Sequence, residues 1–173
     1  MSLRKKLANI AAAEIGVREV GGNNRGPKIL EYQSATWLKP APWPWCAAFV
    51  CWVIKKWLKD PSVRETLSFR NDKVLELWRP KTAAAFDFAN WAKERNLQIL
   101  GRTARALAGD LAIFDFSHIG VVIRDQSKGS TQIVTVEGNT NGKGERDSTS
   151  GDGVWRKMRP TRLVRSYIRL TEL

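Results

Sequence analysis

Residues 42–60, PWPWCAAFVCWVIKKWLKD, decide how the chain is organised. Each proline fixes its own φ and disfavours helix at the preceding residue, so the backbone up to Trp45 is expected to be extended. From Cys46 onward the apolar residues follow a helical period, and Lys55 and Lys59 fall opposite them. The apolar stripe contains Cys46, Phe49, Val50, Val53 and Trp57. We therefore expect an amphipathic helix that begins at Cys46 and places this thiol at the N-terminal end of its buried face.

Helical patterns dominate the chain around this stretch, and short extended patterns dominate its second half. The loop composition of residues 21–27, GGNNRGP, separates the first two helices. Expected helices are residues 28–38, 64–78 and 82–96, after an N-terminal helix with Leu3, Leu7, Ile10 and Ala11 on one face. Expected strands are residues 109–116, 117–125, 131–139, 154–160 and 163–170, with a polar loop over 139–153. Helices followed by an antiparallel meander predict an α+β fold, and we expect one domain over residues 1–173.

The charge balance is strongly basic. The 29 Lys and Arg residues outnumber 17 Asp and Glu residues, which gives a net charge of +12. Such a chain is attracted to polyanions: nucleic acid, anionic lipid or the bacterial envelope. Glu14, Arg18 and Glu19 interrupt the first apolar stretch, so we expect no signal peptide. No run of apolar residues approaches membrane-spanning length, and we expect no membrane span.

The possible chemistry is narrowed by the rarity of histidine and cysteine. His118 is the single histidine, and Cys46 and Cys51 are the only cysteines. On a helix these two thiols point about 140° apart, so we expect them to be unbridged. Three such residues in separate places do not make a structural zinc site, and the chain has no phosphate-binding or dinucleotide-binding glycine motif. We expect no metal and no cofactor, and a nucleophilic hydrolase would have to use a thiol and the imidazole.

Cys46 is the better placed of the two thiols for nucleophilic chemistry. A helix N-terminus and a neighbouring imidazolium both stabilise a thiolate, and the free amides of a first turn can donate to an oxyanion. Cys51 lies mid-helix, where neither a dipole end nor free amides are available, and we interpret it as a packing residue. The alternative for Cys46 is that it too is a small core residue.

His118 begins a predicted strand, and two polar residues end the next one. Strand alternation places His118 and Gly120 on one face, where glycine leaves room beside the ring. Glu137 and Asn139 also share a face if their strand continues that far, and either could accept from the ring nitrogen that faces away from the thiol. The alternative for His118 is a structural histidine at the end of a strand. The alternative for Glu137 and Asn139 is that they are solvated polar residues at a strand end.

Three segments taken together resemble the CHAP family of cysteine amidohydrolases and peptidases, within the wider NlpC/P60-like group. They are PWPWCAAFVCWV, AGDLAIFDFSHIGVVI, and VEGNTN followed by GDGVWRKMRP, with EIGVREVGGNNRGPKILEY similar to the opening of such domains. Within that family the similarity is closest to phage and prophage cell-wall lysis enzymes. It covers most of the chain, and the helical middle from about Pro61 to Ala104 is its least distinctive part.

The resemblance implies a papain-like α+β core, with N-terminal helices packed on a C-terminal antiparallel sheet, that cleaves amide bonds in peptidoglycan. When the family's catalytic roles are transferred to the matching positions of this sequence, Cys46 is the nucleophile, His118 is the base and Glu137 is the orienting group, with Asn139 assisting. The bond is either muramoyl–L-alanine or a peptide bond of the stem or cross-bridge. The acidic calcium loop that precedes the cysteine in some relatives is missing, which also predicts no metal. Expected substrate-binding residues are Trp43, Trp45, Asn23 and Asn24, although simple packing is an alternative for the two tryptophans.

Partners and location follow from the same resemblance. We expect a monomer that is made in the bacterial cytoplasm, is released through a holin-type pore, and acts on peptidoglycan and anionic envelope polymers. The main alternative to this interpretation is a basic nucleic-acid-binding or envelope-binding protein without catalytic activity, which the Arg-rich residues 155–170 suggest. The basic residues are spread along the chain and no nucleic-acid-reading motif is present, so we expect no nucleic-acid partner. A cysteine peptidase or amidase that acts on proteins shares the same chemistry and stays an alternative.

Overall fold

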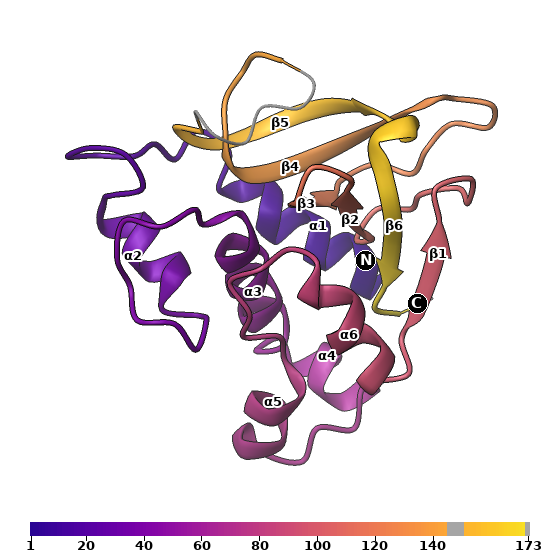
Figure 1. Cartoon of the computed structure of the whole chain (residues 1–173). Helices are drawn as coiled ribbons and strands as arrows, with labels where there is room; N and C mark the ends of the chain where they lie inside the picture. The colour runs from indigo at the N-terminus through magenta and orange to yellow at the C-terminus, as the bar shows by residue number, and fades with distance from the viewer. Residues whose placement is uncertain (145–150, 172–173) are drawn as a thin grey trace.

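Helices occupy the first half of the chain and strands the second in the computed structural model, which describes residues 1–144 and 151–171 (Figure 1). The helices are α1 (Leu3–Ala13), α2 (Pro27–Gln33), α3 (Cys46–Trp57), α4 (Pro61–Thr66), α5 (Asp72–Trp78) and α6 (Asp87–Glu94). The strands are β1 (Gln98–Gly101), β2 (Leu111–Phe114), β3 (His118–Val122), β4 (Gln132–Thr140), β5 (Gly153–Pro160) and β6 (Val164–Arg169), with a 3-10 turn at Thr161–Leu163. This is the α+β arrangement that the sequence predicts.

The six strands form one antiparallel sheet in the order β1-β6-β2-β3-β4-β5. Strands β2 to β5 are the expected meander. The last strand departs from it, because β6 returns to pair with the free edge of β2 rather than with β5. Strand β1 was not predicted, because this four-residue edge strand is largely exposed and has no apolar alternation to reveal it. Figure 1 shows the long β4–β5 hairpin at the top of the sheet and β6 and β1 at its side.

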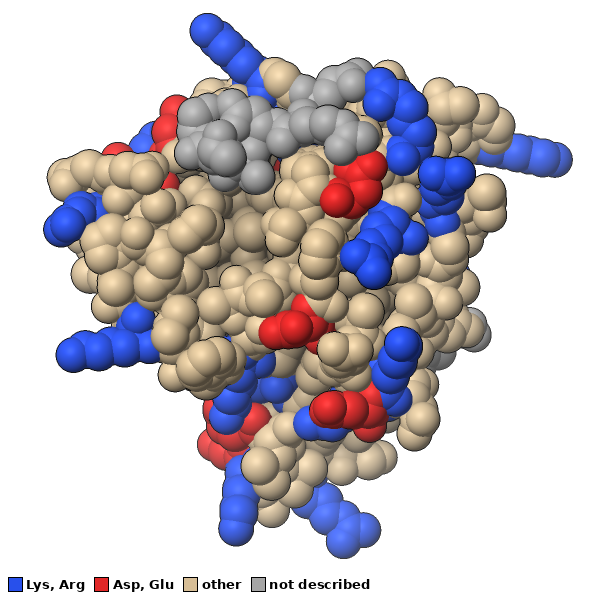
Figure 2. All heavy atoms as spheres, in the orientation of Figure 1, with Lys and Arg blue, Asp and Glu red and all other residues tan. Residues whose placement is uncertain are grey.

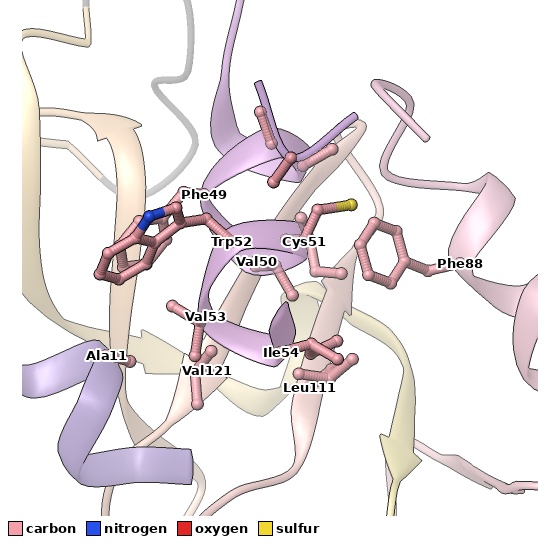
Figure 3. Close-up of a cluster of buried hydrophobic side chains, with 14 of the residues drawn as sticks. Ala11, Phe49, Val50, Cys51, Trp52, Val53, Ile54, Phe88, Leu111 and Val121 are labelled. Carbon is pink, nitrogen blue, oxygen red and sulfur yellow. The ribbon is translucent and has the colours of Figure 1, made fainter. Parts of the chain in front are cut away.

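Helix α3 begins at Cys46, as predicted, but it is not amphipathic. Every residue from Cys46 to Ile54 is buried, and only the last turn carries lysines. The reason is that α3 packs against the helices α1 and α2 and against the strands β3 and β4. Figure 3 shows the result, with Trp52 and Cys51 on different sides of the helix and Phe88 of α6 beside Cys51. The helix that carries Cys46 is therefore the central element of the core.

The remaining helices are shorter than the sequence suggested. The helix expected over residues 64–78 is divided into α4 and α5, because Ser68 has a φ of +57° and the Asn71 side chain caps the start of α5. The helix expected over 82–96 begins only at Asp87. Both ends of the predicted loop 139–153 belong to strands, since β4 runs to Thr140 and β5 begins at Gly153. Residues 145–150 of that loop lie outside the described part of the chain.

The sheet has apolar side chains on both faces. Alternate residues of β2 separate them: Leu111 and Ile113 join the large core around α3, and Ala112 and Phe114 join a smaller cluster with Ile133 and others. Within the described residues, no helix has the length and apolar character needed to cross a membrane.

Candidate active site

The Cys46 thiol lies where an extended segment turns into helix α3. Trp45 is the N-cap and provides no side-chain hydrogen bond, and the first helical bond runs from the Phe49 N–H to the Trp45 carbonyl at 2.9 Å. In the described part of the chain, the backbone N–H groups of residues 46–48 have no acceptor. Cys46 and Cys51 are both free thiols, as expected. The first turn of α3 thus presents a thiol together with unpaired backbone donors.

His118 begins β3 and is completely buried. Its Nε2 lies 2.9 Å from Oε2 of Glu137, and its ring stacks on Phe116 with 5.6 Å between ring centres. A carboxylate only accepts hydrogen bonds, so Nε2 is the nitrogen that carries the proton in the neutral ring. The other nitrogen, Nδ1, is buried and has no aligned hydrogen-bond partner among the described residues.

The pKa of His118 depends on Cys46 as well as on Glu137. Burial lowers the pKa of His118, but the interactions with Cys46 and with Glu137 act in the opposite direction. Together they raise the pKa of His118 to about 9. Since Glu137 occupies Nε2, the nitrogen left for Cys46 is Nδ1. Both the Cys46 thiol and the Glu137 carboxylate therefore act on the imidazole.

Glu137 is held by more groups than His118 alone. The Nε of Arg159 donates to both of its carboxylate oxygens, at 3.0 and 3.2 Å, and the Thr135 hydroxyl donates to Oε1. Burial raises the pKa of Glu137, but the hydrogen bonds from His118 and Arg159 outweigh it and hold this pKa well below its usual value. Gly120 makes the room for this carboxylate, because a Cβ at that position would lie 2.5 Å from the Glu137 Cγ.

A cleft of about 480 Å³ opens beside these residues. Its lining includes Cys46 and Asn139, as well as Asn23 and Asn24 from the loop before α2, so it joins segments that are remote in sequence. The other lining residues are Pro44, Ala83, Ala84, Ala85, Phe116 and Ser117. The structure thus brings the two asparagines predicted to bind substrate to the same cleft as the thiol.

Two expectations about the site need correction. Trp45 does not form a cleft wall: its side chain is completely buried, stacks on Tyr32, and donates its indole N–H to Glu19 at 2.9 Å. The simple strand alternation that would place Asn139 on the same face as Glu137 does not hold. The pairing of β4 with β5 shifts register after Glu137, and Asn139 has a φ of +54°. This places Asn139 at the cleft, while Glu137 contacts the ring. Trp43 is partly exposed, with its indole N–H bonded to the Lys39 carbonyl, and its role as a substrate contact stays a prediction.

Arg159 and Thr135 are the members of this cluster that sequence reasoning missed. Arginine in a strand usually points to solvent, and Arg159 follows the exposed Met158 in strand β5, which has three basic residues. The signal that was available is the two-residue period, which places Thr135 on the same face as Glu137. Neither comparison with protein-family models nor comparison with curated proteins finds a match for this chain.

Proposed function

We propose that this chain is a cysteine amidohydrolase or endopeptidase that cleaves an amide bond in bacterial peptidoglycan, with a papain-like core of the CHAP type. The observation that carries the proposal is the hydrogen bond from His118 Nε2 to Glu137, which leaves Nδ1 for Cys46 at the start of α3. A thiol, a base and an orienting carboxylate in this order are the parts that nucleophilic amide cleavage requires.

The chemistry proceeds in two halves. Nδ1 of His118 takes the thiol proton, and the Cys46 sulfur then attacks the amide carbonyl to form a tetrahedral oxyanion. The N–H groups of residues 46–48, which have no acceptor in the described part of the chain, are available to donate to that oxyanion. The imidazolium gives its proton to the leaving amine as the C–N bond breaks, which leaves a thioester. Water, deprotonated by His118, hydrolyses the thioester and restores the thiol and the free acid.

The choice of cell wall as substrate rests on the CHAP resemblance and on charge. With a net charge of +12, the chain is attracted to an envelope rich in phosphate and carboxylate groups. The proposed bond is either muramoyl–L-alanine or a peptide bond in the stem or cross-bridge. In this account the enzyme is a single-domain monomer that is made in the cytoplasm, passes through a pore of the holin type, and meets its substrate at the wall.

On the face shown in Figure 2, the distribution of charge favours an envelope enzyme over a nucleic-acid-binding protein. On the face shown in Figure 2, Lys and Arg side chains are dispersed and acidic side chains lie between them. A groove that follows a phosphate backbone needs a continuous basic stripe, which this face does not present. Steep salt dependence of DNA binding together with an inert Cys46 would favour the rival interpretation.

The experiment that tests the proposal is digestion of purified peptidoglycan, with new amino groups and new reducing ends measured in parallel. We expect amino groups without reducing ends, and no release by Cys46→Ser. Mass spectrometry of the fragments then identifies the bond. Casein incubated under the same conditions separates a wall enzyme from a general peptidase, which would release amino groups from both substrates.

A further inference from the structure

Arg159 is a fully buried arginine whose side chain is directed at the carboxylate beside His118. Its Nε and Nη2 both donate to Glu137, and its guanidinium lies over the rings of Phe114 and Phe116 at 5.5 and 5.4 Å. The same two rings stack on His118. Arginine, glutamate and histidine are thus fixed in one apolar compartment next to the proposed nucleophile.

Charge balance explains why the guanidinium matters to this compartment. Glu137 and Arg159 cancel, so the cluster is neutral when the thiol and the ring are both uncharged. It is also neutral after the proton has moved from Cys46 to His118, because thiolate and imidazolium cancel as well. Without Arg159 both states carry a net negative charge in a buried site, which favours uptake of a proton.

We propose that Arg159 is a positioning residue, which keeps Glu137 ionised and fixed so that Glu137 accepts from Nε2 and Nδ1 stays directed at Cys46. The effect of Arg159 on rate rests on the proposed function, whereas its effect on the state of His118 does not. Thr135, which donates to Oε1 of Glu137, fixes the same carboxylate from its own strand.

Within the described residues, no cationic side chain other than Arg159 and His118 donates to Glu137. Lys157 is on the same strand two residues away, but its Nζ is held by the carbonyls of Asn141, Lys143 and Gly144. Asp115 is exposed in the turn between β2 and β3. On α3, Cys46 is the ionisable group that acts on the ring.

The variant that tests the inference is Arg159→Met, with Arg156→Met as its matched control because Arg156 is exposed on the same strand. With Arg159 lost, either Glu137 or the Cys46–His118 pair takes up a proton, so the active form is confined to higher pH. We expect the acid limb of kcat/KM to move up by about one pH unit. Arg159→Lys, which restores the charge, should return the limb toward that of the wild type, and Arg156→Met should leave it unchanged. A folded Arg159→Met variant with the wild-type profile would overturn the inference.

The single histidine allows a second readout that needs no activity. In a sample labelled with ¹⁵N histidine, all ring signals belong to His118. Above the titration of the ring, the wild type should show the Nε2–H tautomer, and Arg159→Met should change its ¹⁵N shifts. Unchanged shifts in Arg159→Met, or an Nδ1–H tautomer in the wild type, contradict the inference. If the wild type leaves peptidoglycan intact, the proposed function fails while this measurement still decides the role of Arg159.

Removal of a buried ionic partner can prevent folding, so a double variant completes the design. If Arg159 acts through Glu137, Glu137→Gln combined with Arg159→Met should be more stable to urea than Arg159→Met alone, because it leaves no unpaired charge. A double variant no more stable than Arg159→Met would show that the two residues act independently and would overturn the inference.

Discussion

Gly120→Ala is the smallest change that should disturb the proposed site, because one added methyl group meets the side chain of Glu137. The new Cβ would lie 2.5 Å from the Glu137 Cγ and 3.1 Å from the carbonyl oxygen of Val136. Carbon atoms in contact lie about 3.5–4.0 Å apart, so a displacement of roughly 1 Å is required. Glu137 cannot swing aside freely, because Arg159 and His118 hold its carboxylate.

The expected cost follows from these distances. Insertion of a methyl group into a packed site usually destabilises a protein by about 1–3 kcal/mol, and we expect Gly120→Ala to fall in this range. A shift of about 1 Å in a catalytic group can lower a rate by about 100-fold, and we expect a loss of kcat/KM of that order. Urea denaturation gives the free energy of unfolding, and release of amino groups from peptidoglycan gives the rate.

Gly101→Ala is the matched control for Gly120→Ala. Gly101 is also a strand residue, and a Cβ there has no atom within 4 Å. We expect this control to change neither stability nor rate by a comparable amount. If Gly120→Ala behaves like Gly101→Ala in both assays, the position of Glu137 is not set in the way described here.

Three further predictions concern the thiols, the base and pH. His118→Ala should lower kcat/KM by about 10²–10⁴-fold, the usual contribution of a general base, while circular dichroism shows an intact fold. Cys51→Ala should keep wild-type kcat/KM and lose about 1 kcal/mol of unfolding free energy, because it removes only one buried sulfur that packs near Phe88. Burial lowers the pKa of His118, but Cys46 and Glu137 raise it from 6.5 to about 9. The charged imidazolium therefore stabilises the fold fully below the pKa that His118 has in the unfolded chain, and this stabilisation is lost as the pH rises through the pKa in the folded protein. The basic limb of the pH–rate profile should lie in the same pH range. A basic limb near the ordinary pKa of histidine would contradict this assignment.

The start of α3 and the meander could be predicted because local chemistry decides both. The prolines before Cys46 hold the chain extended, and the β-branched runs of β2 to β4 favour strands in any context. Burial on all sides of α3 could not be predicted, because its packing partners α1, α2 and β3 come from remote segments. The same limit applies to Trp45, whose burial depends on Tyr32 and Glu19.

The residues of the candidate site could be proposed from the sequence, but their geometry could not. Elimination pointed to a thiol and His118, the expected helix start favoured Cys46 over Cys51, and strand spacing left Glu137 and Asn139 as alternatives. The structure separates these two, because the register shift after Glu137 turns Asn139 toward the cleft. Arg159 reaches Glu137 only through the pairing of β4 with β5, and no local pattern contains that information.

The most direct test of the account is to digest purified peptidoglycan with the wild type, Cys46→Ala and Cys51→Ala in parallel. The account predicts new amino groups without new reducing ends from the wild type and from Cys51→Ala, and none from Cys46→Ala. Release of amino groups by Cys46→Ala, or reducing ends in place of amino groups, would contradict a cysteine amidohydrolase built on Cys46.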